Sequence, residues 1–398
     1  MSDIIFELTN EQRRYFCLPP IRKSWKRMEV KQKTYDPCRT FIYLNGSVIR
    51  RVIQVSDESG FATYREFSVD LSVSEDGKYL ISGASGTKKR RLTVYELEQT
   101  PPVGMALDFK APYVYICNAD ADMDYYSSAH EGYELNSLES FKSWVSSWCE
   151  ESTEEDLKDI RRFSRRKSTV HEYKEGDIFR FKLGRRAYGY GRIVLDARNI
   201  ISSGKPYWNF LEEKHLYASV YHAVSEGKDI SARDLDGKMT MPPHLMTNGK
   251  FLNGEYEIIG NLPATDESDL PIHYGEIWDK KEFRHTLYQR GHEFITVEYD
   301  DPVEEGYANR YAGDSVHVTL PILKRCILDN SNGAFWQMWN GGAAGADLRH
   351  PALSDTRIRV LKHVGVIYDE KIAEARRKNP RPNLKSKIVR VKYKRKIY

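Results

Sequence analysis

The sequence lacks the long apolar run of a membrane-spanning segment and has few cysteines. No stretch of its 398 residues approaches the roughly 18 apolar residues needed to cross a bilayer. The opening MSDIIFELTNEQRRYF is too charged for a secretory signal, so we expect a cytoplasmic protein without a membrane partner. Its five cysteines are scattered and include no CxxC, which argues against a structural zinc site and against a disulfide framework.

Motifs for cofactor, metal and nucleophilic chemistry are also missing. The chain has no GK[ST] for a nucleotide phosphate and no HxxxH or HExxH for a metal ion. The spacing of His273, His285, His292 and His317 is too irregular for ligands, and His317 alternates with valines like an outward residue of a strand. Cys326 lies in the apolar run LPILKRCILDN, where a free cysteine is usually a small buried hydrophobe. We therefore expect no catalytic residue, no cofactor and no metal ion, and a chain that is not an enzyme.

One acidic segment matches a calcium-binding loop only in part. DADMDYYSSAHE places Asp120, Asp122, Asp124 and Glu131 at positions 1, 3, 5 and 12 of an EF-hand-like loop. Tyr125 stands where that loop needs a glycine, and the preceding YVYIC has the pattern of a strand instead of a helix. An acidic surface loop explains the segment better than a calcium site.

Charge is divided unevenly along the chain. Residues 371–398 hold twelve Lys or Arg and one Glu, although the net charge of the whole chain is only +4. Such a basic tail can displace counterions from the phosphates of a nucleic acid. Runs of like charge are usually solvated, however, and KIVRVKYKRKIY also alternates like a strand. Nucleic-acid binding by the tail stays open but is not favoured.

Hydrophobic periodicity predicts a sheet followed by helices. Residues 40–120 alternate with period 2 between glycine-containing turns, which is typical of an antiparallel meander. The meander starts with a hairpin across Asn45 and Gly46, a pair suited to positive φ at both centres of a tight turn. From residue 136 the apolar side chains recur every three to four positions, which predicts an amphipathic helix.

The next segment runs from acidic to basic and predicts a second helix near 152–164, because this order of charges complements the helix macrodipole. Asn136 with Glu139 and Ser152 with Glu155 are the expected capping pairs of the two helices.

The length of the chain exceeds that of a single core, so we expect two domains. We predict an α+β fold with two sheet-rich domains, whose antiparallel sheets are strongly bent and which are joined by a helical connector. The second sheet is expected to approach a barrel. The predicted boundaries are an N-terminal domain 1–150, a connector 151–170, a second domain 171–370 and a basic tail 371–398.

The most regular pattern is YKEGDIFRFKLGRRAYGYGRIVLD, which starts at Tyr173. Residues 178–183 and 188–195 alternate like two strands of a hairpin. In that arrangement Gly189 and Gly191 lie where the ring of Phe179 or Phe181 can pack across the pair. A phosphate-binding loop would need a helix directly after the glycines, whereas RIVLD continues the strand. We therefore interpret these glycines as architectural.

This stretch, followed by LYASVYHAV and later PIHYGEIW, resembles the immunity protein 26 family of bacterial polymorphic-toxin systems over roughly residues 173–328. The resemblance implies a non-enzymatic protein that protects a cell by binding a toxin domain, and it implies no catalytic residues. Residues 1–150 lie outside it.

Candidate partner-binding residues come from acidic loops bordered by proline and from a glycine-rich tryptophan segment. Such loops offer negative charge to a basic partner, and tryptophans suit a binding surface, although they also plug cores. The candidates are Asp266, Glu267, Asp269, Asp300, Asp301, Glu304, Glu305, Trp336 and Trp339. The favoured function is therefore an immunity protein that neutralises a cognate toxin by stoichiometric binding. A nucleic-acid-associated protein using the basic tail and an uncharacterised hydrolase remain as alternatives.

Overall fold

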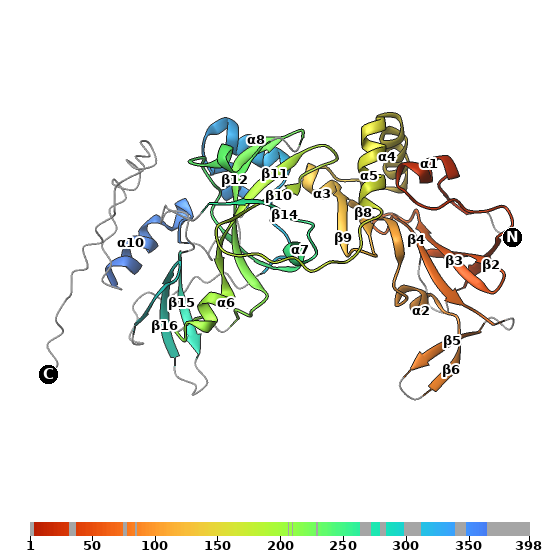
Figure 1. The fold of residues 1–398 in the computed structure, drawn as a ribbon, viewed down its shortest axis with the longest axis horizontal. Coiled ribbons are helices and arrows are strands. Elements are labelled where there is room, and N and C mark those ends of the chain that lie inside the picture. The colour runs from red at the N-terminus through yellow and green to blue at the C-terminus, as the bar shows by residue number, and fades with distance from the viewer. Residues whose placement is uncertain are drawn as a thin grey trace. The chain divides into compact units, whose positions relative to one another are not determined.

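The computed structural model divides the chain into two compact units. Unit 1 comprises Met1–His171 with Lys182–Arg186, and unit 2 comprises Glu172–Phe181 with Ala187–Tyr398 (Figure 1). Both combine helices with antiparallel sheets, so the predicted α+β class is confirmed. The structure describes residues 4–31, 37–74, 78–83, 86–205, 207–208, 210–227, 230–262, 272–278, 284–297, 312–338 and 348–363.

Unit 1 is built on a seven-stranded sheet in the order β1-β2-β3-β4-β7-β8-β9, in which each strand is antiparallel to its neighbours. This arrangement confirms the predicted meander. A two-stranded ribbon, β5 and β6, is inserted after β4. The strands are β1 (Lys26–Val30), β2 (Arg39–Asn45), β3 (Val48–Ser56), β4 (Thr63–Ser72), β5 (Lys78–Gly83), β6 (Gly86–Arg91), β7 (Val103–Lys110), β8 (Tyr113–Asn118) and β9 (Met123–Ser127).

The first predicted hairpin is present, but its turn lies one residue later than expected. Asn45 pairs with Val48, so the two central residues are Gly46 and Ser47. Only Gly46 has a positive φ, at 61°. A glycine with positive φ at the first central position is typical of a type II′ turn, whose twist also suits a hairpin.

The helices of unit 1 are α1 (Asn10–Tyr15), α2 (Val94–Glu98), α3 (Ser128–Glu131), α4 (Leu138–Glu150) and α5 (Glu154–Phe163). The two helices expected between residues 136 and 164 are therefore confirmed as α4 and α5.

Both predicted capping pairs are wrong by one residue. Ser137 with Ser140 forms the capping box of α4, and Thr153 with Asp156 forms that of α5. In each case two neighbouring residues both had side chains that can cap, and the helix starts after the second of them.

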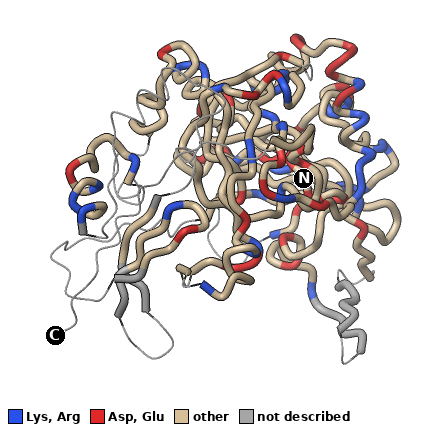
Figure 2. The backbone as a smooth tube through the Cα atoms, turned by 60° about the vertical axis from the view of Figure 1, so that its left-hand side comes forward, with Lys and Arg blue, Asp and Glu red and all other residues tan. Residues whose placement is uncertain are grey.

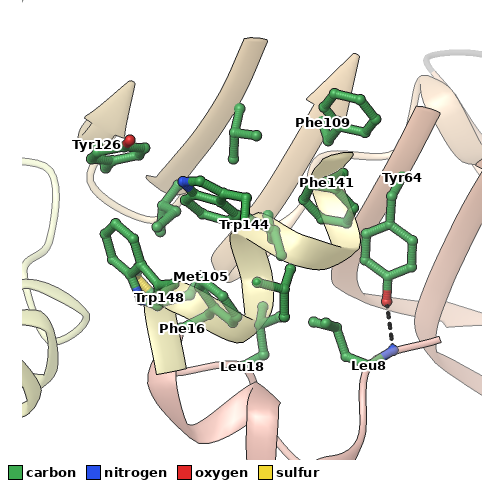
Figure 3. Close-up of a cluster of buried hydrophobic side chains, with 14 of the residues drawn as sticks. Leu8, Phe16, Leu18, Tyr64, Met105, Phe109, Tyr126, Phe141, Trp144 and Trp148 are labelled. Carbon is green, nitrogen blue, oxygen red and sulfur yellow. Dashed lines mark hydrogen bonds between the residues drawn. The ribbon is translucent and has the colours of Figure 1, made fainter. Parts of the chain in front are cut away.

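The main core of unit 1 lies between one face of the sheet and α4 (Figure 3). The spacing of Phe141, Trp144 and Trp148 places all three rings on the buried face of α4. Phe141 stacks on Phe109 with ring centroids 4.7 Å apart, and Phe16 stacks on both tryptophans at 5.9 Å. These large rings supply most of the apolar area that holds the helix to the sheet.

A buried ionic network fastens the N-terminal segment to the same sheet. Glu66 on β4 is fully buried and accepts from the Arg13 Nε at 2.7 Å and from the Tyr64 hydroxyl at 2.5 Å. The Arg51 Nε lies 3.5 Å from the same carboxylate. The Leu8 amide in turn donates to the Tyr64 hydroxyl (Figure 3). Glu66 therefore contacts both buried guanidinium groups, and Glu7 is a second carboxylate partner of Arg13 at 2.8 Å.

Unit 2 contains a five-stranded sheet in the order β13-β12-β11-β10-β14 and a three-stranded sheet in the order β15-β16-β17. The larger sheet ends at β13 and β14, so it is open and does not form the barrel that we expected. The strands are β10 (Asp177–Lys182), β11 (Tyr188–Asp196), β12 (His215–Ser225), β13 (His244–Thr247), β14 (Glu257–Asn261), β15 (Ile272–Trp278), β16 (Arg284–Arg290) and β17 (Glu293–Val297).

Short helices surround these sheets. They are α6 (Ala197–Ser202), α7 (Gly249–Leu252), α8 (Leu320–Asp329), α9 (Gly333–Met338) and α10 (Ser354–His363), with 3₁₀ turns η1 (Ala232–Leu235) and η4 (Pro351–Leu353). Among the described residues of both units, no helix has both the length and the apolar character for a membrane span.

Gly191 of the β10–β11 hairpin has the architectural role that the sequence predicts. A Cβ on Gly191 would lie 2.8 Å from the Phe179 Cε1 and 2.7 Å from the Ser219 carbonyl oxygen. Phe179 itself stacks on Tyr256 at 5.3 Å. The Phe179 ring therefore occupies the space that a side chain at position 191 would need, and only glycine fits there.

Candidate functional site

Most of the candidate partner-binding residues lie outside the described residues. These are Asp266, Glu267, Asp269, Asp300, Asp301, Glu304, Glu305 and Trp339. Their role stays a prediction. Trp336 is described, and it leads to a polar cluster in unit 2 that the sequence analysis did not identify.

Trp336 lies on α9 and is partly buried. Its ring packs edge-on against Phe335 at 5.2 Å and against His350 at 5.1 Å, where His350 caps the turn η4 by accepting from the Ala352 amide. The ring is therefore held by neighbours on two elements while part of it stays accessible. A rigid, partly exposed tryptophan is the kind of side chain that anchors protein interfaces.

Asn332, which directly precedes α9, joins this helix to the five-stranded sheet. Its side-chain amide donates to the Thr240 carbonyl at 3.1 Å, and its Oδ1 lies 2.8 Å from the His222 Nε2 on β12. The Asn332 NH₂ group donates to the Thr240 carbonyl, so the Asn332 Oδ1 is the atom that faces His222. An amide oxygen can only accept a hydrogen bond, and the His222 proton that it accepts is therefore on Nε2. Burial lowers the pKa of His222 despite this hydrogen bond, which keeps the ring neutral.

A second buried histidine lies at the start of β13. His244 is 4% exposed, and neither ring nitrogen makes a hydrogen bond within the described part of the chain. Burial, reinforced by the nearby His317, lowers the pKa of His244 to about 3. The two rings are 6.5 Å apart. Two imidazoles alone do not make a metal site, and among the described residues no group of three metal-ligating side chains gathers.

His292 forms a different pair with Glu175, which precedes β10. Their Nε2 and Oε2 atoms are 2.9 Å apart, and the pairing raises the pKa of His292. Burial alone would raise the pKa of Glu175, but hydrogen bonds from His292, the Asp196 amide and Asn199 outweigh it and lower the value. The Glu175 carboxylate is occupied by groups of the protein itself. The pair therefore stabilises the fold and is not arranged to transfer a proton to a substrate.

The remaining sequence motifs have structural partners. Asp120 accepts from the Gly104 amide at 2.9 Å and pairs with Lys167, whereas Glu131 accepts from the Tyr126 hydroxyl at 2.6 Å. The acids of the EF-hand-like segment therefore do not converge on a shared point. Cys326 is fully buried, which confirms its prediction as a small hydrophobe, and burial raises the pKa of its thiol.

The outward position of His317 is also confirmed, because it is exposed between the buried valines 316 and 318, although this segment is extended without belonging to a strand. His273 is buried. The side chain of His285 lies outside the described part of the structure.

Sequence reasoning missed Asn332, His222 and Glu175. Asn332 follows the left-handed C-cap Asn330 in the polar string NSNG, which predicts a turn but not its distant partners. His222 has a valine two residues before it and another two after it, so its polar contact could not be read from periodicity.

Comparison with known families assigns part of unit 2. No curated protein and no solved structure matches the chain. Residues 174–286, which include the β10–β11 hairpin, β12 and Glu175, match the family model of immunity protein 26. The chain is thus similar to the immunity protein 26 family over this segment, which is less than a third of its length.

Proposed function

We propose that this protein is an immunity protein that neutralises a cognate toxin by forming a stoichiometric complex. The observation that carries the proposal is the family match over residues 174–286. The matched segment supplies every strand of the five-stranded sheet of unit 2, so the proposal concerns the structural centre of this unit.

Binding without catalysis also agrees with how the polar groups of unit 2 are used. Glu175 is occupied by three donors, Asp196 holds both Arg198 and the start of α6, and His222 is tied to Asn332. A catalytic acid or base must instead keep a lone pair or proton available to the substrate. These groups stabilise a binding scaffold.

We place the contact surface at Trp336 and at the acidic loops of unit 2. Trp336 would act as the aromatic anchor, because its ring is already ordered by Phe335 and His350 and would lose little conformational entropy on binding. Asp300, Asp301, Glu304 and Glu305 would steer a basic toxin toward this surface by long-range attraction.

The proposal is tested with a candidate toxin domain, sought among the products of the open reading frames beside the gene. Isothermal titration calorimetry should give a single transition at a 1:1 ratio. Trp336→Ala should weaken binding by about 2 kcal/mol or more, as expected for an anchor residue. Tyr95→Ala in unit 1, which removes a ring that is 66% exposed, serves as the matched control and should leave the affinity unchanged.

Electrostatic steering is tested by association kinetics. Changing Asp300 and Asp301 to Asn, together with Glu304 and Glu305 to Gln, should slow association by roughly tenfold at low salt. The difference should vanish at high salt, since exposed charges are screened beyond about 8 Å at physiological ionic strength. Equal rates at low salt would remove these loops from the contact surface and leave Trp336 as its remaining marker.

A further inference from the structure

A row of cations runs along the exposed side of α5 in unit 1. Lys158, Arg161, Arg162 and Arg165 are spaced i, i+3, i+4 and i+7, which places them on one face of the helix and its continuation. All four are exposed and line a shallow hollow of about 370 Å³. Along this segment the acidic start of α5 gives way to a basic end, seen as red followed by blue in Figure 2.

Two acids of α5, Asp156 and Asp159, pair with cations outside this row. Asp156 is bound by Arg186 at 2.6 Å, and Asp159 is bound by Lys182 at 3.1 Å. Burial opposes the charge on Asp156, but its hydrogen bonds outweigh this effect and lower its pKa. Both carboxylates are therefore directed to the segment Lys182–Arg186.

The three arginines of the row are left without partners. In the part of the chain that the structure describes, their guanidinium groups make no hydrogen bond and no ion pair. Lys158 has one surface contact, with Glu155 at 3.5 Å. Favourable interaction with the macrodipole explains Arg161 and Arg162 in the last turn of the helix, but not Arg165, which lies past the last helical residue, Phe163.

The backbone beneath the row is held firmly. Ile160 and Phe163 belong to the core of unit 1, and Asn118, which is fully buried, donates to the Phe163 carbonyl at 3.0 Å and to the Arg166 carbonyl at 3.2 Å. These hydrogen bonds satisfy carbonyls at the helix end and fix the chain that carries Arg165. The cations are thus displayed on an ordered platform, which lowers the entropy cost of binding a ligand.

We propose that this face of α5 binds the phosphate backbone of a nucleic-acid duplex. Seven residues of helix span about 10 Å, and a duplex presents one phosphate charge per about 1.7 Å of axis, so several phosphates lie within reach of the row. The fork of a guanidinium group matches two phosphate oxygens. Every exposed residue from 153 to 169 is polar or charged, so the face lacks the apolar centre of a protein interface.

The test uses the full chain and a fluorescein-labelled 20-base-pair DNA duplex, with binding followed by fluorescence anisotropy at several salt concentrations. Arg161→Gln, Arg162→Gln and Arg165→Gln combined should raise Kd by roughly tenfold or more near 0.1 M salt. The slope of log K against log salt should become shallower by about 2 to 3, because each lost phosphate contact contributes about 0.9. A thermal melt establishes that the variant is folded.

A matched control removes the same charge elsewhere. Lys205→Gln, Lys214→Gln and Lys238→Gln combined lower the net charge by the same amount from exposed positions of unit 2. We expect Kd to change by less than about twofold and the salt slope to stay within about one unit of the wild type, since these lysines lie outside the row and make no phosphate contact. If both triple variants weaken binding equally, the attraction is one of net charge and the proposal is wrong.

A local readout separates this face from every other basic segment of the chain. Acetylation of Lys158, followed by mass spectrometry, should be suppressed when the duplex is bound, whereas acetylation of Lys214 should be unchanged. Unaltered acetylation of Lys158, or displacement of the duplex by poly-glutamate at equal charge, would overturn the assignment to phosphate. No toxin is needed, so failure here leaves the proposed immunity function untouched.

Discussion

Unit 1 packs 26 buried residues of its sheet and helices into one apolar cluster, and 11 others form a second cluster. The described core of unit 2 includes an aromatic group of Phe179, Phe181, Phe251 and Tyr256 beside the β10–β11 hairpin. The buried polar groups differ as well. Unit 1 buries the charged residues Arg13, Arg51 and Glu66, while the buried histidines of the described residues all belong to unit 2. Unit 2 also buries charged residues, among them Arg180 and Asp196. It differs from unit 1 in adding the buried imidazoles of His222 and His244, whose pKa values are lowered by burial.

We therefore expect the stability of unit 1 to be sensitive to removal of a charged partner and that of unit 2 to be sensitive to a fall in pH. A buried ion pair destabilises the fold when one partner is removed, because the remaining charge stays buried without a countercharge in a medium of low polarity. A buried neutral imidazole lowers the free energy of unfolding as the pH falls, because the unfolded chain then binds the proton more readily than the folded protein. The predictions below use these contrasts, starting with the largest expected effect.

Glu66→Gln should break unit 1. Arg51 would stay buried without a countercharge, and Arg13 would keep only its pair with Glu7. We expect a loss of about 3–5 kcal/mol in the free energy of unfolding, measured by urea titration followed by circular dichroism. Glu29→Gln is the control, because Glu29 and Arg39 form a pair whose side chains are 29% and 28% exposed, in contrast to the fully buried Glu66. We expect this pair to contribute about 1 kcal/mol. Adding Arg51→Met to Glu66→Gln should recover part of the loss. Equal effects of the two single variants would contradict the network.

Gly191→Val should destabilise unit 2 by overpacking its core, without any change of charge. The new side chain would overlap the Phe179 ring and the Ser219 carbonyl, and we expect destabilisation of about 1–3 kcal/mol in the same urea assay. The matched comparison is Gly191→Ala against Gly249→Ala. A Cβ on Gly249 meets nothing within 4 Å, so that variant should be neutral or stabilised by up to about 1 kcal/mol. An unchanged melting temperature for Gly191→Val would refute the architectural role of this glycine.

Acid should weaken unit 2 through His244. Its pKa is about 3 in the folded protein and near 6.5 in the unfolded chain, so the folded state binds fewer protons between these values. Stability from the neutral ring is present above pH 6.5 and declines as the pH falls. His244→Phe should therefore lose less stability between pH 7 and pH 5 than the wild type, by on the order of 2 kcal/mol. His171→Phe, at an exposed position of unit 1, should leave the pH dependence unchanged; the same gain in both variants would count against His244.

His292 should show the smallest effect and the opposite sign. Because Glu175 raises the pKa of His292, stability from their pair is complete below pH 6.5 and is lost as the pH rises through the raised value. The lowered pKa of Glu175 keeps the pair intact down to acid pH. Since 43% of the His292 side chain is exposed, the contribution is small. Melting temperatures of the wild type and His292→Gln should converge between pH 6 and pH 8.5, and parallel curves would exclude the pair as a source of stability.

Local patterns predicted much of the fold. Alternation with period 2 located the meander and the β10–β11 hairpin, and helical spacing located α4, because side chains that face a core repeat with the geometry of their element. The exact starts of α4 and α5 escaped prediction, since Asn136 and Ser137, and likewise Ser152 and Thr153, compete for the capping position.

Long-range contacts could not be predicted. Arg13 is 53 residues from Glu66 in the sequence. Arg51 lies on the neighbouring strand, but the alternation of the strands does not indicate that three charged side chains meet inside the unit. The same holds for Asn332 and His222, which are 110 residues apart. The open edges of the five-stranded sheet follow from strand pairing across the whole of unit 2, which periodicity does not encode. Conversely, the role of Gly191 could be predicted because Gly191 and Phe179, which pack together, lie in the same hairpin.

The central claim is that the chain protects a cell by binding a toxin, and growth rescue tests it most directly. Cells expressing a candidate toxin domain, chosen from the open reading frames beside the gene and shown to arrest growth, are grown with and without this protein at matched expression levels. We predict full growth with the wild type and partial growth with Trp336→Ala. Growth arrest that the wild-type protein does not relieve, with the toxin shown to be active and the protein shown to be folded, would contradict the account.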